Sequence, residues 1–213
     1  TMPTSKYDPN KVNVEETDGK NRKVGTYGKL KNGLTADYLA VPTINSFYIG
    51  MNAENVKEPA RKAVAYAINQ QEVVNNIFKG RGEPAYHFTP PGIFPGGAKN
   101  YEKSAKENWP YGYNKSMLDE AKSIMEDAGY SADNKYEFTF TYYASSTSWG
   151  DLGKQLQSKL ASAHIKMNIE KAPFSTLLNR GRKGNLEAYS LGWIMDWPAP
   201  DNFLQNAYPP LTD

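Results

Sequence analysis

The sequence predicts an α/β protein in which helices cover a mixed β-sheet. Helical and strand periodicities alternate through its second half, and short connections rich in proline or glycine separate them. The 213 residues are 39% hydrophobic, enough for a sizeable core. The 25 basic and 23 acidic residues are evenly scattered, which argues against nucleic acid and favours a small-molecule partner. No apolar run is long enough to insert this segment into a membrane.

The N-terminal region differs in composition from the rest of the chain. Residues 1–37 are polar and show no sustained periodicity, which predicts a loop and a short hairpin. The next residues, 38–51, are apolar and predict a strand interrupted by Pro42. We therefore expect two parts, a polar region at 1–37 and a larger folded part at 38–213.

Two helices and a long connection are expected next. Residues 59–80 carry apolar residues at helical spacing and predict one long amphipathic helix. Five prolines and five glycines in the segment that follows, up to residue 113, predict a loop without regular structure. The second helix is expected to be capped at its start by Asn114 or Ser116, and at its end by Gly129 in the left-handed conformation.

The remaining elements alternate between strand and helix. Strands are predicted at 136–142, 165–169 and 186–193, and helices at 149–163 and 173–178. Right-handed crossovers between such strands bring their carboxyl ends to one edge of the sheet. We expect the ligand at that rim, near Tyr143 and Trp193.

The most informative segment is GWIMDWPAPDNF, residues 192–203, directly after the last predicted strand. A proline-rich loop at the end of a strand holds its side chains at the rim of the sheet. Asp196 lies between Trp193 and Trp197, so its carboxylate has apolar neighbours on both sides and is suited to hold a cation away from water. The structural alternatives are a turn-forming aspartate and two tryptophans of the core.

Other polar residues suit either a site or a local structural role. Asp201 can be paired with Asp196 as in a hydrolase, but it also suits the N-cap of a closing helix. Ser145 and Ser146 can contact a ligand or cap the helix that follows them. No nucleophile, base and orienting group occur together, which predicts a protein that is not an enzyme. With no cysteine, two isolated histidines and no phosphate-binding loop, we expect no metal site and no cofactor.

Four segments together resemble the family 5 solute-binding proteins of ABC importers. They are EPARKAVAYAINQQEVV (58–74), GRGEPA (80–85), PYGYNKSMLDEAKSIMEDAGY (110–130) and GWIMDWPAPDNF (192–203). The resemblance implies a periplasmic-binding-protein-like type II clamp with two lobes, either a lipoprotein on the extracellular face of the membrane or a free periplasmic protein. It further implies that residues 38–213 form most of one ligand-binding lobe, incomplete at its C-terminus.

The resemblance also assigns roles to single residues. It implies that Asp196 pairs with the α-amine of a peptide and that Trp193 and Phe174 face the ligand. The turn of Ser145 and Ser146 is expected to approach the peptide, and the bulky Trp197 to narrow the site. Ser190 stands where some oligopeptide binders carry a basic residue, which argues against recognition of a ligand carboxylate there.

The resemblance therefore predicts the substrate-binding component of an ABC transporter, which captures oligopeptides or dipeptides reversibly and works with an ABC permease. Two alternatives remain open at this point. One is a ligand-sensing domain fused to a regulatory protein. The other is a binder of a non-peptide solute, such as a sugar, a nickel complex or heme.

Overall fold

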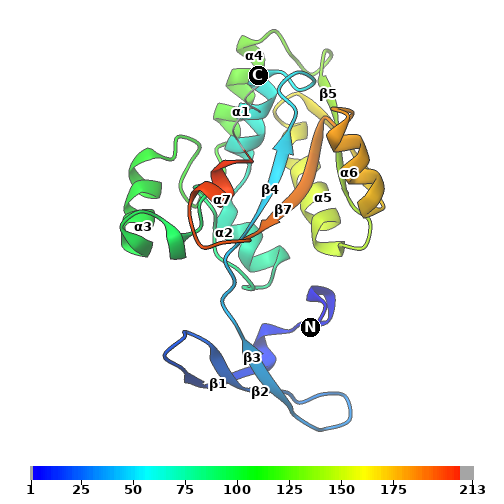
Figure 1. The fold of residues 1–213 in the computed structure, drawn as a ribbon. Coiled ribbons are helices and arrows are strands. Elements are labelled where there is room, and N and C mark those ends of the chain that lie inside the picture. Colours follow the sequence, from blue (N-terminus) through cyan, green and yellow to red (C-terminus); the bar gives the residue numbers. More distant parts are fainter. Residues whose placement is uncertain (1, 207–213) are drawn as a thin grey trace. The chain divides into compact units, whose positions relative to one another are not determined.

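The computed structural model describes residues 2–206, which belong to two compact units (Figure 1). One unit comprises Thr1–Ile44 and the other Asn45–Asp213. Each unit is described by itself below. Within residues 2–206, no helix combines the length and the apolar character that a membrane span requires.

The first unit contains a three-stranded antiparallel sheet rather than only the predicted short hairpin. Its strands are β1 (Val12–Thr17), β2 (Lys23–Tyr27) and β3 (Ala36–Ala40), in the order β1-β2-β3, after the short 3₁₀ turns η1 (Thr4–Lys6) and η2 (Pro9–Lys11). Five of the six residues of β1 are exposed. The strand therefore lacks the alternation of apolar and polar residues by which a half-buried strand is recognised.

The second unit is built on a four-stranded mixed sheet, which confirms the predicted fold class. Its strands are β4 (Asn45–Met51), β5 (Tyr136–Tyr143), β6 (Ile165–Ala172) and β7 (Ala188–Ile194). They are arranged in the order β4-β7-β5-β6. β5 is parallel to both β6 and β7, whereas β4 is antiparallel to β7.

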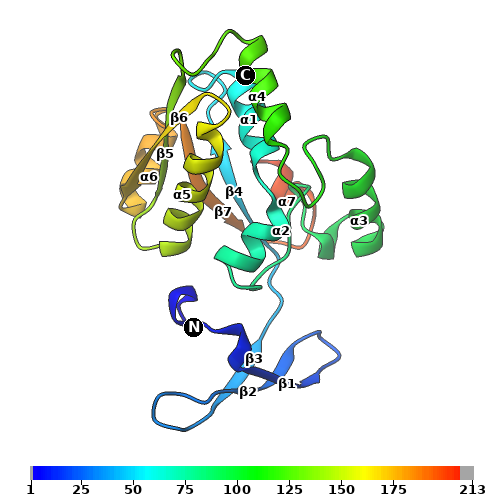
Figure 2. The same cartoon turned by 180° about the vertical axis from the view of Figure 1, so that it is seen from behind.

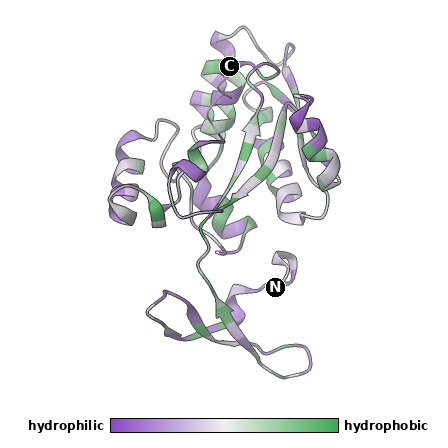
Figure 3. Cartoon of the chain, viewed as in Figure 1, coloured by the Kyte–Doolittle hydropathy of each residue, from purple (hydrophilic) through white to green (hydrophobic). Residues whose placement is uncertain are grey.

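Helices cover both faces of this sheet (Figures 1 and 2). Three of them, α1 (Glu58–Ala67), α4 (Leu118–Asp127) and α5 (Thr147–Ala161), share one core with β5 and β6. That core includes Phe138, Phe140, Leu156 and Leu160. On the other face lies α6 (Phe174–Arg182), and the short α7 (Asp201–Leu204) follows β7. The helices α1, α4 and α6 each carry hydrophobic and hydrophilic residues, as amphipathic helices do (Figure 3).

The single long helix predicted at 59–80 is wrong. Helix α1 ends at Ala67, Ile68 is extended, and a new helical segment begins with α2 (Gln70–Glu72) and continues as the π-helix η3 (Val73–Ile77). The Oδ1 atom of Asn69 accepts a hydrogen bond from the backbone N–H of Glu72, 3.0 Å away. Asparagine is strongly preferred at such N-caps, and this local preference interrupts an otherwise continuous apolar stripe.

The predicted irregular loop before residue 113 contains a helix, so that prediction is also wrong. A short 3₁₀ turn, η4 (Pro91–Ile93), precedes α3 (Gly97–Asn108). The prolines stop at Pro95 and resume at Pro110, which leaves room for this helix between them. Tyr101 and Ala105, four residues apart, are its buried residues.

Of the two caps predicted for the next helix, α4, the C-terminal one is confirmed and the N-terminal one is wrong. Gly129 follows α4 in the left-handed conformation with φ 87°, as expected. At the other end, Met117 is the N-cap and makes no side-chain capping bond, so neither Asn114 nor Ser116 serves as the cap. The Ser116 hydroxyl instead donates to the carbonyl oxygen of Ala67, 2.9 Å away.

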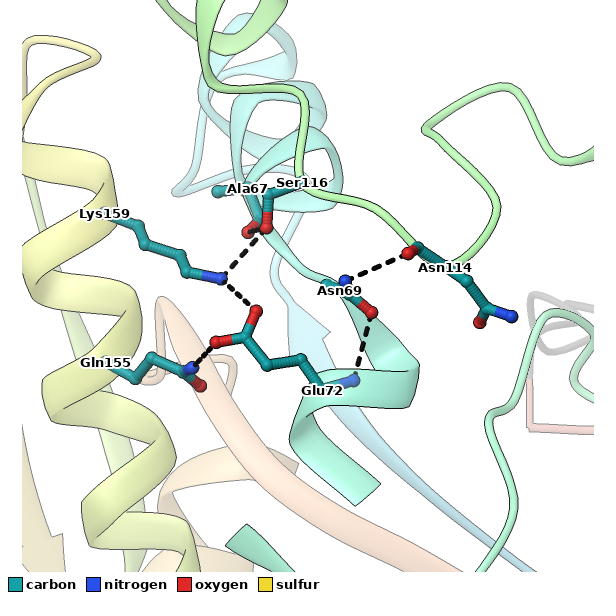
Figure 4. A network of polar contacts seen from close by, with 7 residues as sticks. All are labelled: Ala67, Asn69, Glu72, Asn114, Ser116, Gln155 and Lys159. Carbon is teal, nitrogen blue, oxygen red and sulfur yellow. Dashed lines mark hydrogen bonds and ion pairs between the residues drawn. The ribbon is translucent and has the colours of Figure 1, made fainter. Parts of the chain in front are cut away.

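Ser116 belongs to a polar network that joins α2, α5 and the segment before α4 (Figure 4). Lys159 Nζ donates to Glu72 Oε2 at 2.8 Å and to Ser116 Oγ at 2.9 Å. Glu72 also accepts a hydrogen bond from Gln155. The side chains of Lys159 and Glu72 are 20% and 32% exposed, so this ion pair is better shielded from water than the exposed pairs of the surface.

We expect Glu72→Ala to lower the free energy of unfolding by about 1–3 kcal/mol, because it leaves the partly buried Lys159 ammonium without its carboxylate. The matched control is Glu102→Ala, which removes the exposed pair of Glu102 with Lys106 in α3 and is expected to change stability by less than about 1 kcal/mol. Urea denaturation followed by tryptophan fluorescence measures both, since all 4 tryptophans lie in the second unit. Equal effects of the two substitutions would contradict a structural role for the network.

Candidate functional site

The rim of the four-stranded sheet leaves part of β7 without a neighbour. Because β5 and β7 are parallel, their carboxyl ends lie at the same edge of the sheet, as predicted. β7 pairs with β4 along its whole length, Ala188–Ile194, but with β5 only at Ala188 and Tyr189. From Ser190 to Ile194, the β5 side of β7 thus faces no other strand of residues 2–206, and backbone groups there are available to a ligand.

A hollow of about 210 Å³ lies at this rim. Its lining comprises residues 190–192 and 194 of β7 together with Phe47, Tyr143, Trp149 and Phe174. Three of the apolar side chains at the hollow are well exposed: Phe47 by 59%, Phe174 by 50% and Ile194 by 69%. The rings of Tyr143 and Phe174 meet edge to face, with centroids 5.6 Å apart. An exposed apolar cluster of this kind marks a place where a ligand or partner is bound.

The ring of Phe47 lies against Gly192, its cross-strand neighbour. A Cβ atom at position 192 would come within 2.4 Å of Phe47 Cδ1, so only glycine permits this close approach. Trp193 alternates with Gly192 along β7 and therefore lies on the opposite face of the sheet. Phe174 lines the hollow, whereas Trp193 is near the end of β7 and Asp196 lies in the turn between β7 and α7.

Asn202 holds that turn together. Its side chain is buried, and its Oδ1 atom accepts two hydrogen bonds, from Trp193 Nε1 and from the backbone N–H of Asp196, both at 3.0 Å. Both partners are N–H donors, which requires the amide oxygen rather than its nitrogen to face them. One buried oxygen atom thus fixes the end of β7, the backbone of Asp196 and α7 relative to one another.

The Asp196 carboxylate is exposed at the surface of this turn. Its backbone is fixed by Asn202, yet its side chain forms no hydrogen bond or ion pair within the part of the chain that the structure describes. Trp197, 44% exposed, donates its indole N–H to Asp201 Oδ2 at 3.2 Å. Asp201 is the first residue of α7 and Pro200 its N-cap, so the predicted N-cap at Asp201 is wrong by one position.

The two serines before α5 differ in their surroundings. Ser146 caps the helix, because its Oγ accepts a hydrogen bond from the backbone N–H of Trp149 at 3.4 Å. Ser145 is exposed in the same turn. Since Trp149 and Tyr143 both line the hollow, this turn connects two of its walls.

The charged groups of α6 and β6 pair with one another. Arg180 forms an ion pair with Glu170 at 2.8 Å, and this guanidinium holds the pKa of the Glu170 carboxyl below its usual value. The Thr141 hydroxyl donates to the same carboxylate. Within residues 2–206, no group of three or more histidine, cysteine, aspartate or glutamate side chains is arranged to hold a metal ion.

Sequence reasoning missed Asn202, Phe47 and Trp149 as residues of this region. Asn202 and Phe203 follow Asp201 within a four-residue helix, and both are buried. A polar residue buried at the start of so short a helix indicates a structural role, but the partners of its side chain cannot be predicted from sequence spacing. Phe47 and Trp149 reach the hollow only through the pairing of β4 with β7 and the packing of α5, which are long-range contacts.

Solved structures share this fold. The murein tripeptide-binding protein MppA of Escherichia coli aligns with a TM-score of 0.64 and 19% identity, covering 77% of this chain and 32% of that chain. DppA from Helicobacter pylori, in complex with the peptide STSA, aligns with a TM-score of 0.61 and 24% identity over 76% of this chain and 29% of that chain. These similarities confirm the predicted fold class, that of type II periplasmic binding proteins.

The sequence comparison then defines the family. Residues 12–212 match the model of the bacterial extracellular solute-binding proteins, family 5 middle, and the chain belongs to this family. It is 28% identical over 195 residues to the periplasmic oligopeptide-binding protein OppA of Salmonella typhimurium, which covers 86% of this chain and 33% of that protein. It is 27% identical over 190 residues to heme-binding protein A of Haemophilus influenzae, covering 85% and 32%. The chain thus spans about a third of the length of these relatives.

We expect Asn202→Ala to release the Trp193 indole. Loss of the shared acceptor should shift the Trp193 Nε1–H resonance and speed its exchange with solvent, because the hydrogen bond at 3.0 Å is removed. Spectra of ¹⁵N-labelled protein resolve the 4 indole signals, and Trp193→Phe assigns the one in question. Asn185→Ala, at an exposed asparagine before β7, is the control and should leave that signal in place. An unchanged Trp193 signal in Asn202→Ala would contradict the role given to Asn202.

Proposed function

We propose that the chain contributes one ligand-binding lobe, predicted at residues 38–213, to the substrate-binding component of an ABC importer, and that the ligand is a peptide. The observation that carries the proposal is the Asp196 carboxylate. It is exposed, its backbone is held in place by Asn202, and it lies in the turn directly after the free edge of β7. No lysine or arginine of residues 2–206 neutralises it.

Asp196 is proposed to pair with the α-amine of the peptide. An ammonium group that leaves water loses its hydration, and a carboxylate compensates with a charge-assisted hydrogen bond. The indoles of Trp193 and Trp197, which flank Asp196 in the sequence, are proposed to provide apolar surface beside that pair and to strengthen it by excluding water.

The free edge of β7 is proposed to receive the main chain of the peptide. Between Ser190 and Ile194 the β5 side of this strand has no partner strand among the described residues, and an extended peptide can add to such an edge through backbone hydrogen bonds. These bonds do not depend on the side chains of the ligand. Phe174, Ser145 and Ser146 are proposed to contact the peptide from the side of the hollow.

The proposal also includes a cellular location and a partner protein. The family of extracellular solute-binding proteins and the relatives named periplasmic oligopeptide-binding proteins support a location on the extracellular face of the membrane or in the periplasm. The similarity to DppA, named an ABC transporter-associated protein, supports delivery of the ligand to an ABC permease. Heme is the second candidate ligand, because heme-binding protein A is among the relatives. A spectroscopic titration with heme, run beside the peptide measurements, distinguishes the two.

In the full-length two-lobed protein, where the site is covered, we expect Asp196→Asn to weaken binding of a free tri- or tetrapeptide by roughly 2–5 kcal/mol, because the ammonium group removed from water loses its counter-ion. N-acetylation of the same peptide removes the positive charge of its α-amine, the other member of the pair, and should weaken binding by a similar free energy. Because the two changes disrupt one interaction, acetylation should cost little further in the Asp196→Asn variant. Isothermal titration calorimetry measures all four combinations.

The control variant is Asp201→Asn, which neutralises the other carboxylate of the same turn. It is expected to preserve the preference for a free amine, since Asp201 Oδ2 already accepts the Trp197 indole N–H. Equal affinity of the free and the acetylated peptide for the unmodified protein would refute the role of Asp196.

A further inference from the structure

The hollow at the rim contains a polar atom that the proposed contacts do not use. Ser190 is 2% exposed, and its Oγ has no hydrogen-bond partner within the described part of the chain. A buried hydroxyl without a partner is unfavourable, and such groups are rare in folded proteins unless a ligand or water satisfies them. Ser190 lines the hollow, so a change of its χ1 rotamer would turn the hydroxyl toward a group that enters the hollow and supplies the missing partner.

The walls around Ser190 are aromatic and uncharged. Phe47, Tyr143, Trp149 and Phe174 contribute rings, and no acidic or basic side chain is part of the lining. Gly192, the next residue on the same face of β7, adds no side chain, and the ring of Phe47 lies against it. Aromatic walls favour another ring through stacked and edge-to-face contacts, whereas a charged side chain would lose its hydration there without compensation.

The volume of the hollow fits a single ring. An apolar cavity of about 150 Å³ in another protein is known to hold benzene, and the hollow here measures about 210 Å³. It therefore has room for a six-membered ring with two small substituents, such as a hydroxyl and a methyl group. The hollow lies along the free edge of β7, so one side chain of a peptide bound at that edge would be close enough to enter it.

We infer that the hollow is a subsite for an uncharged phenol ring, that of a tyrosine in the bound peptide, whose hydroxyl forms a hydrogen bond with Ser190 Oγ. The peptide part of this inference rests on the proposed function, whereas the affinity for the ring itself does not. The subsite gives the protein a preference for ligands with tyrosine at one position, because a site with a polar group for the phenol hydroxyl discriminates against phenylalanine.

The first test uses p-cresol and toluene, which differ only in the phenol hydroxyl, and follows the Trp149 indole signal by NMR. We expect p-cresol to bind several-fold more tightly than toluene, and Ser190→Ala to abolish that difference while the affinity for toluene is kept. Ser158→Ala, at an exposed serine of α5, should change neither affinity. Equal affinities of the two compounds, or a difference that persists in Ser190→Ala, would show that the phenol hydroxyl does not bond to Ser190 and would overturn the inference.

A second variant tests the walls of the subsite. Phe174 is half-exposed, so Phe174→Ala should leave the fold intact, which the urea midpoint verifies. This substitution is expected to weaken the binding of p-cresol and of toluene alike by several-fold, because it removes an aromatic ring from the wall and leaves the polar partner in place. Unchanged affinities for both compounds would place them outside the hollow and contradict the assignment.

The peptide test places tyrosine, phenylalanine or glutamate at each position of tetra-alanine in turn. At one position, tyrosine is expected to bind about tenfold more tightly than alanine and several-fold more tightly than phenylalanine, with glutamate the weakest. Peptides that bind without such a preference would overturn the subsite but leave the proposed function intact. Binding of p-cresol without binding of any peptide would overturn the proposed function and support the ring subsite.

Discussion

The arrangement of the site depends on the two hydrogen bonds that Asn202 accepts. The indole N–H of Trp193 and the backbone N–H of Asp196 share one buried oxygen, and either donor would be left without its partner if the turn moved away from α7. The end of β7, the turn and the helix are therefore held as one unit. These two hydrogen bonds fix the backbone of Asp196 while its carboxylate stays exposed, so the carboxylate is positioned without being neutralised.

The second constraint comes from the sheet, in which β7 pairs with its two neighbouring strands over different lengths. The pairing with β4 over Ala188–Ile194 makes the strand rigid, while the pairing with β5 ends at Tyr189. A rigid strand with one free edge presents its backbone groups in a regular row, and such edges are usually covered or blunted in proteins. Here the free edge lies beside exposed aromatic side chains instead, which is the surface expected of a binding site rather than of a protected edge.

Sequence patterns predicted those features that depend on neighbouring residues. The alternating aromatic residues of β5 and the apolar stripe of α5 locate both elements, since periodicity reflects the face that each one buries. The break at Asn69 and the helix α3 escaped prediction, because a single cap and a gap between prolines are weaker signals than a continuous stripe. The acceptor role of Asn202 and the unpaired hydroxyl of Ser190 could not be predicted at all. Both depend on which strands pair and in what register, and the order β4-β7-β5-β6 is a long-range property.

The two proposed contacts differ in how they depend on water. An exposed carboxylate such as Asp196 contributes only about 0–1 kcal/mol to an ion pair in water, whereas the same pair contributes much more once it is covered. The hollow beside Ser190 has aromatic walls and no charged lining, so its attraction for a ring is present before anything covers the site. A ligand would thus be held first by its ring and its main chain. The contact between the amine and Asp196 then adds affinity only when water is excluded from Asp196. Of the two proposed contacts, it is therefore the one whose strength differs between a covered site and an open one.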